Sequence, residues 1–236
     1  MNYALIFAGG VGSRMGINSV PKQFLPLAGR PIIINTIEKF DNHSDIDAII
    51  VVCVESWIVQ FYNMLDESAI KKVKWVVPGG KTGQESIYLG LKKLFAQCEC
   101  PRRAVVLIHD GVRPMITPQL ITENIESVRM HGSAITVAPA IETIVQTHQD
   151  GSVVGVIDRN DAFLARAPQS FFLQDLMDAH NKAIENHNLN EVDTTCLMRR
   201  YGYPLHTVPG PAENIKITTL TDYYMAKAIY ERDELR

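Results

Sequence analysis

Hydrophobic and polar positions along the chain follow two patterns that alternate. Short apolar runs rich in β-branched residues, typical of strands buried on both faces of a sheet, alternate with longer amphipathic segments, typical of helices. The predicted strands are 3–8, 47–54, 73–77, 104–110 and 133–140. The predicted helices are 31–40, 55–70, 82–97 and 117–131. This alternation predicts βαβ units, and therefore a Rossmann-like α/β fold with a mostly parallel sheet flanked by helices.

The alternation stops at residues 141–157, where two β-rich runs surround Asp150 and Gly151. Asp-Gly between such runs is a strong hairpin signal. We expect this hairpin to interrupt the βαβ series and to project as an arm at about 139–160. Two interpretations stay open. The arm is a plain surface hairpin, or it pairs with a second subunit, since exposed strand edges usually need cover.

The remaining segment, 158–236, is less regular. Residues 158–171, DRNDAFLARAPQSF, are predicted to form a loop. Helices are predicted near 172–186, 193–201 and 221–233, with the short run NIKITT before the last of them. The sequence contains no internal repeat, low-complexity tract or linker. We therefore expect one domain over 1–236, from which the arm projects.

Composition and charge narrow the range of functions. Apolar residues make up 46% of the chain and charged residues 21%, as in an ordinary globular protein. The net charge of −3 offers no global basic field for nucleic acid, although a local cluster of Arg and Lys suffices for a small anion. No apolar run approaches the ~18 residues that a membrane span requires.

The four cysteines do not form a metal pattern. Cys53 lies inside an apolar run, and Cys98 and Cys100 have no second pair at zinc spacing; the fourth is Cys196. We expect all four to be reduced and structural. Because the chain also begins on a strand-like segment with no basic leader, the expected compartment is the cytoplasm.

The two most polar clusters, Gly9–Arg14 and His109–Arg113, each follow the end of a predicted strand. Ligands of parallel sheets bind beyond the carboxyl ends of the strands. Both clusters are therefore expected at one edge of the sheet, as parts of one site.

The glycine cluster FAGGVGSRMG departs from the two commonest phosphate-binding patterns. The dinucleotide fingerprint begins well at Gly10 and Gly12, but its sixth position is Met15, and no acidic residue closes a strand near residue 30. The Walker pattern also fails, because the nearest lysine is Lys22.

What remains is Gly-Gly-x-Gly-x-Arg-Met followed by Pro-Lys-Gln. Backbone N–H groups in a glycine-rich turn form a concave anion site, since no Cβ blocks the approach of the anion. Arg14 adds a planar fork for phosphate oxygens, and Lys22 adds a mobile point charge. Two cations beside a polyphosphate suit nucleotidyl transfer, in which charge builds up on the phosphates. The alternative is that both residues are solvated surface charges.

Four motifs, in this order, resemble the sugar- and polyol-phosphate cytidylyltransferases: FAGGVGSRMG…PKQFLPLAGRPII, HDGVRP, DRN…APQSF and NIKIT. The resemblance covers nearly the whole chain. It implies a Rossmann-like fold, CTP as co-substrate, a polyol phosphate as acceptor and Mg²⁺ as cofactor. It also implies a homodimer joined by the projecting β-arm.

The resemblance assigns roles on the nucleotide side. The backbone of Ala8, Gly9 and Gly10 would lie near the cytosine and ribose, and the turn through Gly12 would wrap the triphosphate. The three cations Arg14, Lys22 and Lys216 would stabilise the α-phosphorus and the leaving pyrophosphate.

The resemblance also assigns residues that would contact the metal and the acceptor. Asp110 would lie near the metal and the polyol hydroxyls, and Arg113 would brace its loop. Arg159 would reach from the arm towards the acceptor phosphate, in the other subunit. No general base is required, because a phosphate monoester with a second pKa of about 6 is mostly ionised at pH 7. We therefore expect His109 to hold the loop rather than to transfer a proton.

Two positions depart from the family pattern. In GGKTGQES, Gly80 and Ser86 fit as nucleotide-side residues, but Gly83 replaces an arginine, for which Lys81 is a candidate substitute. Ala167 replaces a threonine near the expected acceptor phosphate, and the neighbouring Arg166 is a candidate compensation.

The particular residues of these motifs favour ribitol 5-phosphate as the acceptor, with 2-C-methyl-D-erythritol 4-phosphate as the alternative. AGG…RMG, HDGVRP, APQSF and NIKITT are typical of the ribitol branch of the family. Two other classes stay open: a non-catalytic nucleotide-binding domain, and an NAD-dependent reductase, against which the failed fingerprint argues.

Overall fold

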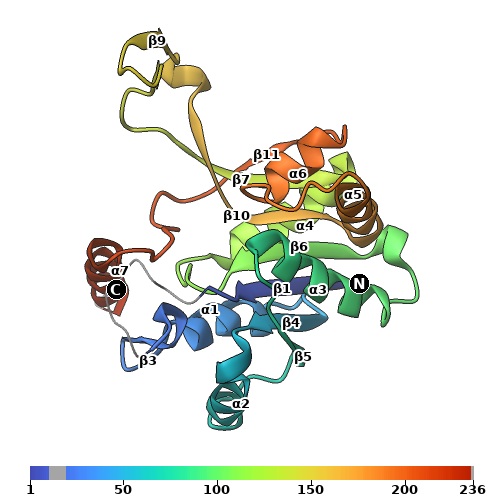
Figure 1. Ribbon diagram of the computed structural model, residues 1–236. Helices are drawn as coiled ribbons and strands as arrows, with labels where there is room; N and C mark the ends of the chain where they lie inside the picture. Colours follow the sequence, from blue (N-terminus) through green and yellow to red (C-terminus); the bar gives the residue numbers. More distant parts are fainter. Residues whose placement is uncertain (11–19, 235–236) are drawn as a thin grey trace.

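A twisted sheet of seven strands forms the centre of the molecule, in the order β11-β7-β10-β6-β1-β4-β5 (Figure 1). The computed structural model describes residues 1–10 and 20–234. Within this sheet all strand pairs are parallel except those of β10, which is antiparallel to both of its neighbours. The strands are β1 (Asn2–Ala8), β4 (Ala48–Cys53), β5 (Val73–Pro78), β6 (Val105–Asp110), β7 (Ser133–Pro139), β10 (Phe163–Phe172) and β11 (Thr207–Pro209). The predicted mostly parallel α/β sheet is confirmed.

Helices cover both faces of this sheet. Strand β6 shows why: Val105 and Leu107 belong to one apolar cluster, while Val106 and Ile108 belong to the other. Successive side chains of a strand point to opposite faces, so a run of four apolar residues needs cover on both. One face carries α1 (Ile32–Asp41), α2 (Ile58–Asp66) and α4 (Pro118–His131). The other carries α3 (Gly83–Phe95), α5 (Leu173–Glu185) and α6 (Thr194–Arg200).

The ends of these helices follow local signals in the sequence. Thr82 caps α3 by accepting a hydrogen bond from the backbone N–H of Glu85, and Thr117 caps α4 in the same way. Gly132 ends α4 at φ +84°, a left-handed conformation that costs glycine little. No helix among residues 1–10 and 20–234 is long and apolar enough to cross a membrane.

The C-terminal helix α7 (Leu220–Glu234) packs against the beginning of the chain. Ala226 shares a small apolar cluster with Leu27 and Ile32, and Ile217, which precedes the helix, lies in the same cluster. The backbone N–H of Ile217 donates to the carbonyl of Val112 at 3.0 Å. This contact brings the NIKIT segment to the loop that follows β6.

The predicted hairpin is confirmed. Strands β8 (Val145–Thr147) and β9 (Val153–Val156) form a separate antiparallel pair, and Gly151 takes φ +86° in the turn. Figure 1 shows the hairpin standing away from the central sheet, between the end of β7 and the start of β10. Its valines are exposed: Val153 by 61% and Val156 by 63%.

The predicted loop over 158–171 is wrong for most of its length. Residues 163–172 form β10, which pairs with both β6 and β7. The strand was hidden because Arg166 and Pro168 interrupt its pattern, and Pro168 cannot donate to a ladder. The pairing with β7 shifts register between Ala165 and Gln169, and the shift accommodates this irregularity. Only the long-range pairing makes a strand of this segment.

Other differences are small. The predicted helix 55–70 begins as a 3₁₀ turn at Glu55–Trp57 and ends at Asp66. The short edge strand β11 was not predicted, because three residues carry too little periodic signal.

Candidate active site

The carboxyl ends of β1 and β6 lie side by side, as the polar clusters that follow them predicted. The backbone N–H of Gly111 donates to the carbonyl of Phe7 at 2.8 Å, which joins the loops after the two strands. An added Cβ on Gly111 would lie 3.2 Å from the Cβ of Ala8, so the backbones approach closely. The described start of the glycine turn, Gly9 and Gly10, and the HDGVRP loop therefore lie at one edge of the sheet.

Gln23 holds the described part of the glycine turn. Its side chain is 1% exposed, and its Nε2 donates to the carbonyls of Ala8 at 2.7 Å and Gly10 at 3.1 Å. The structure thus gives the third residue of Pro-Lys-Gln a role that sequence reasoning missed. Gly12 and Arg14 lie outside the described residues.

A second glycine turn, residues 79–83, packs beside the first. The hydroxyl of Ser86 accepts from the backbone N–H of Gly80 at 2.9 Å and donates to the carbonyl of Thr82 at 2.8 Å. A Cβ on Gly79 or on Gly9 would lie 3.2–3.3 Å from this hydroxyl oxygen. Ser86 therefore lies where both turns meet.

The position of Gly83 is open towards the pocket. A Cβ there would meet nothing nearer than the ring of Phe7, at 3.9 Å. Lys81 is exposed and does not belong to the described residues that line this pocket. The side chain that follows Gly83, Gln84, lines the pocket instead.

Three charged side chains form the centre of the site, and we call them the charged cluster: Asp110, Arg113 and Lys216. Nε of Arg113 lies 2.7 Å from Oδ2 of Asp110, and Nζ of Lys216 lies 2.6 Å from Oδ1. Nη1 of Arg113 also donates to the carbonyl of Asn214 at 2.8 Å. The structure thus brings together three of the residues that the sequence singled out.

The charged cluster keeps Asp110 ionised. Burial by itself would raise the pKa of this carboxyl, but the positive charges of Lys216 and Arg113 outweigh it and hold the pKa well below its usual range. The side chain of Lys216 is 43% exposed, whereas that of Arg113 is only 10% exposed. Arg113 is therefore a fixed brace, and Lys216 keeps access to an anion in the pocket.

His109 is buried beside the charged cluster. One of its ring nitrogens, Nε2, lies 3.0 Å from the carbonyl of Arg113. Burial lowers the pKa of His109 to about 4, although its hydrogen bond to Arg113 opposes this shift. The ring is therefore neutral at pH 7, and Nε2–H donates to that carbonyl. This geometry agrees with a role in holding the loop.

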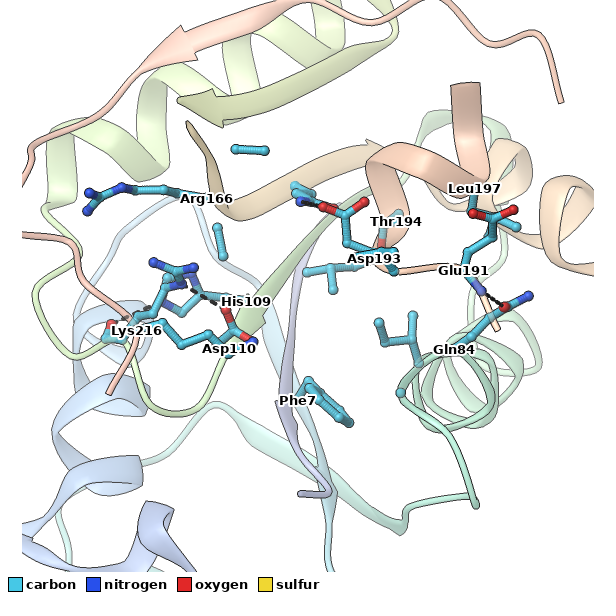
Figure 2. Close-up of a pocket in the computed structure, with 18 of the residues that line it drawn as sticks. Phe7, Gln84, His109, Asp110, Arg166, Glu191, Asp193, Thr194, Leu197 and Lys216 are labelled. Carbon is cyan, nitrogen blue, oxygen red and sulfur yellow. Dashed lines mark hydrogen bonds and ion pairs between the residues drawn. The ribbon is translucent and has the colours of Figure 1, made fainter. Parts of the chain in front are cut away.

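The opposite side of the pocket is polar, and Figure 2 shows it facing the charged cluster. We call these residues the far wall: Gln84, Gln169, Glu191, Asp193 and Thr194. Asp193 caps α6 through its Oδ1, and its Oδ2 accepts from Nε2 of Gln169 at 2.9 Å. Sequence reasoning missed this wall. The only local signal was the capping pattern at Asp193.

Two residues beside the pocket come from β10. Ala167 leaves the pocket without the hydroxyl of the family pattern, and its carbonyl accepts from Nδ2 of Asn214 at 2.7 Å. Arg166 lines the same pocket, and its Nη1 donates to the carbonyl of Ala212 at 2.7 Å. Burial first, and then the charge of Arg113, lower the pKa of Arg166. A third cation, Arg166, thus lines the same pocket as Arg113 and Lys216.

Two predicted residues lie apart from this pocket. Arg159 is exposed at the base of the arm, in a 3₁₀ turn at Arg159–Asp161, and is not among the described pocket residues. Lys22 follows the undescribed segment 11–19. Burial would raise the pKa of Asp222 at the start of α7, but hydrogen bonds from Thr219 and Thr218 lower it, and the positive charge of Lys22 adds a smaller contribution. One chain by itself does not bring Arg159 to the charged cluster.

The donor set suits a cation that arrives with a nucleotide. The described residues contain no group of three or more His, Cys, Asp and Glu side chains placed to hold a metal. Asp110, which stays ionised, lines the pocket, and its two carboxylate oxygens contact Arg113 and Lys216. Mg²⁺ is commonly held by one or two carboxylates together with substrate phosphates and water, and such a metal fits here.

Comparison with known proteins gives a consistent result. Residues 3–232 match the family described as IspD, 2-C-methyl-D-erythritol 4-phosphate cytidylyltransferase. A ribitol-5-phosphate cytidylyltransferase of Vibrio parahaemolyticus is 50% identical over 99% of this chain and 98% of the relative. A ribitol-5-phosphate cytidylyltransferase of Streptococcus agalactiae is 47% identical over 99% of this chain and 97% of the relative. A 2-C-methyl-D-erythritol 4-phosphate cytidylyltransferase of Clostridium botulinum is 36% identical over 98% of both chains.

Solved structures agree with the fold. The 4-diphosphocytidyl-2C-methyl-D-erythritol synthase of Anaerococcus prevotii superposes with a TM-score of 0.84 at 26% identity, over 98% of this chain and 96% of the other. The corresponding cytidylyltransferase of Francisella tularensis gives a TM-score of 0.77 at 27% identity, over 97% and 99%.

Proposed function

The chain belongs to the IspD family of cytidylyltransferases, and we propose that it transfers CMP from CTP to ribitol 5-phosphate, releasing pyrophosphate and forming CDP-ribitol. The observation that carries this proposal is the near-full-length identity of 47–50% to relatives named for that reaction. The charged cluster would supply the charge neutralisation that the reaction requires, which supports the proposal.

A second acceptor, 2-C-methyl-D-erythritol 4-phosphate, is kept as the alternative. The matching family is described by that substrate, and a relative at 36% identity carries the same name. Both acceptors are phosphate monoesters of small polyols, so the transfer step is the same for either.

The acceptor phosphate is the nucleophile. One of its oxygens forms a bond to the α-phosphorus of CTP, and the bond from that phosphorus to the bridging oxygen of pyrophosphate breaks. Because the monoester is mostly ionised at pH 7, no proton has to be removed. Catalysis then depends on positioning and on neutralising charge. A neutral, buried His109 fits this scheme, since no general base is needed.

We assign the cations to the phosphates. Lys216 would leave Asp110 in part and contact the phosphates, since its amine is half-exposed beside the pocket. Lys22 and Arg14 would neutralise the triphosphate and the leaving pyrophosphate. Arg166 is a candidate contact for the acceptor phosphate, in place of the hydroxyl absent at Ala167.

On the nucleotide side we assign backbone groups and small side chains. Ala8, Gly9, Gly10 and Gly12 would wrap the nucleotide, and the turn around Gly80 and Ser86 would contact the cytosine. The hydrogen bonds of Gln23 to Ala8 and Gly10 support the first assignment, because they orient that backbone.

Asp110 would hold Mg²⁺ together with the triphosphate. When bound, the ion would screen phosphate charge and orient the α-phosphorus. Arg113 would keep the carboxylate in place through its 2.7 Å contact. Asp110 would also accept from hydroxyl groups of the polyol.

A homodimer joined by the arm would complete the site. The arm exposes several large apolar side chains to water, among them Ile141, Val153 and Val156. Exposed apolar side chains grouped in this way are typical of a protein–protein contact. Arg159 stands at the base of this arm and does not reach its own pocket. We therefore assign Arg159 to the acceptor phosphate of the partner subunit, and describe the chain as one nucleotidyltransferase domain with a dimerisation arm at about 139–160.

The cytoplasm is the proposed compartment. All four cysteines are free in the structure, and two of them, Cys100 and Cys196, are exposed. Exposed free thiols persist best in a reducing environment.

Release of pyrophosphate tests the proposed function. Purified enzyme with CTP and Mg²⁺ should release pyrophosphate with ribitol 5-phosphate at a kcat/KM at least tenfold above that with 2-C-methyl-D-erythritol 4-phosphate. The reverse preference would establish the alternative acceptor. Release with neither acceptor would refute the proposed activity, and oxidation of NADH would point to the reductase class instead.

A further inference from the structure

Gln84 joins two parts of the pocket that are far apart in the sequence. It lies in the first turn of α3, and its side chain reaches the loop between α5 and α6, residues 186–193 (Figure 2). Its Nε2 donates to the carbonyl of Asn188 at 2.9 Å, across 104 residues. Its Oε1 accepts from the backbone N–H of Glu191 at 2.9 Å. A primary amide can donate and accept at once, which a carboxylate cannot.

At its other end, Gln84 is tied to the second glycine turn. Only one residue separates it from Ser86, whose hydroxyl holds the backbone of Gly80 and lies against Gly9. Because Gly80, Gln84 and Ser86 lie in the first turn of α3 or just before it, a shift of the second glycine turn moves Gln84 as well.

The loop that Gln84 holds has polar anchors but little apolar burial near the pocket. Nδ2 of Asn188 donates to the carboxylate of Glu191 at 2.8 Å, and Arg200 pairs with the same carboxylate. Leu189 is 48% exposed and Val192 is 91% exposed, so neither side chain fixes the loop by burial. Segments with few buried apolar contacts open at low free-energy cost. The two hydrogen bonds of Gln84 fix the backbone of the loop at Asn188 and Glu191 and tie it to α3, which the side-chain contacts of Glu191 do not do.

This loop carries the polar groups of the far wall. Glu191 and Asp193 line the pocket from the loop, and Gln169 connects to it from β10 by accepting from the backbone N–H of Thr195 at 2.9 Å. Carboxylate and amide groups on this side, opposite Lys216 and Arg113, suit the hydroxyl groups of a polyol chain whose phosphate lies among the cations.

We propose that Gln84 is a positioning residue that couples the nucleotide-side turn to the far wall, so that bound nucleotide sets the shape of the acceptor site. The inference rests on the proposed function, because it takes the far wall as the place of the acceptor's hydroxyl-bearing chain. Gln84 acts through the loop and has no role at the reacting phosphorus.

The test compares Gln84→Ala with wild type and with Gln119→Ala. Gln119 is an exposed glutamine in the first turn of α4, away from the pocket, and its Nε2 donates to Glu123 at 2.7 Å. We expect Gln84→Ala to raise the KM for ribitol 5-phosphate about tenfold, on the scale of losing two hydrogen bonds. The KM for CTP should change less than about twofold, and Gln119→Ala should match wild type. Gln84→Glu, which keeps the acceptor for Glu191 N–H but loses the donor to Asn188, should be intermediate.

A binding measurement isolates the coupling itself. Titration calorimetry with ribitol 5-phosphate, with and without a CTP analogue methylene-bridged between its α- and β-phosphates, should show tighter acceptor binding to wild type when the analogue is present. By linkage, Gln84→Ala should reduce that ratio towards one. A loop that is merely less stable would weaken binding in both conditions equally.

The outcomes separate cleanly. If wild type releases no pyrophosphate with either polyol phosphate, the proposed function fails and this inference with it. If wild type is active but Gln84→Ala leaves the acceptor KM unchanged, or raises both KM values equally, the coupling role is wrong. Circular dichroism checks the fold of each variant, and Gln84→Glu carries the test if Gln84→Ala does not fold.

Discussion

Asp110 is held between two cations that come from different parts of the chain. Arg113 lies three residues away and is nearly buried, whereas Lys216 arrives from the segment before α7. Because Lys216 is half-exposed and paired by a single contact of 2.6 Å, an incoming phosphate can compete for it. We infer that the pair prepares the lysine for a phosphate ligand.

Lys22→Ala tests the lysine of the Pro-Lys-Gln motif. We expect kcat to fall more than ~100-fold, because a positive charge near the developing phosphate charge would be lost. Lys74→Ala is the matched control, since Lys74 is exposed on β5 and its Nζ donates to the carbonyl of Lys71. Stopped-flow or steady-state pyrophosphate release measures the rates. An unchanged kcat in Lys22→Ala would remove this residue from the mechanism.

The residues of the charged cluster could be singled out from the sequence, whereas those of the far wall could not. Asp110 and Arg113 lie in one short motif directly after a strand, and a local pattern reveals them. Asp193 is an ordinary N-cap residue, which needs no ligand to explain it, and Gln84 is an ordinary polar residue in the first turn of a helix. Only the pocket that they share distinguishes them.

At the scale of elements, the arm is the segment whose cover is not given by the described chain. Among residues 1–10 and 20–234 its two short strands pair only with each other, and a two-stranded hairpin is at best marginally stable by itself in water. Burial against a second copy would stabilise it and bring Arg159 to another pocket.

We expect Arg159→Ala to raise the acceptor KM about tenfold or more while the CTP KM stays within about twofold, the scale of losing one charge-assisted contact. The double variant Val154→Asp/Val156→Asp should halve the mass in analytical ultracentrifugation and reproduce the same rise in KM. Met130→Asp, on an exposed methionine of α4, is the matched control. A monomeric double variant with normal acceptor KM would contradict the shared site.

At the scale of the whole molecule, two buried histidines make stability depend on pH. His109 and His180 are both within 2% of complete burial, and burial lowers the pKa of each to about 4. In the unfolded chain their pKa is about 6.5, so between about pH 6.5 and pH 4 the unfolded state binds protons that the folded state does not. The free energy of unfolding therefore falls as pH falls through this range.

Denaturant unfolding at several pH values measures this effect. Each histidine should contribute a loss of about 3 kcal/mol by pH 4, at about 1.4 kcal/mol per unit of pKa difference. His180→Phe should make the fall between pH 6.5 and pH 5 clearly shallower. Asp110 adds nothing in that interval, because its stabilisation is present above its ordinary pKa of about 4 and is lost only below it. A stability that does not change between pH 6.5 and pH 5 would rule out this account.

The sequence by itself determined most strands and helices of the first 140 residues, the hairpin, and the placement of Asp110 and Arg113 in one loop after a strand. Periodicity, caps and turn signals depend on residues that are close in the sequence, so a single sequence is enough to recognise them. Only the tertiary structure decided that residues 163–172 are a strand, that Lys216 lies on Asp110 and that Gln84 holds the loop at Glu191. These contacts join distant residues, as between Arg113 and Asn214, 101 residues apart. These contacts form only when the packed fold brings distant residues together, so no local sequence pattern predicts them.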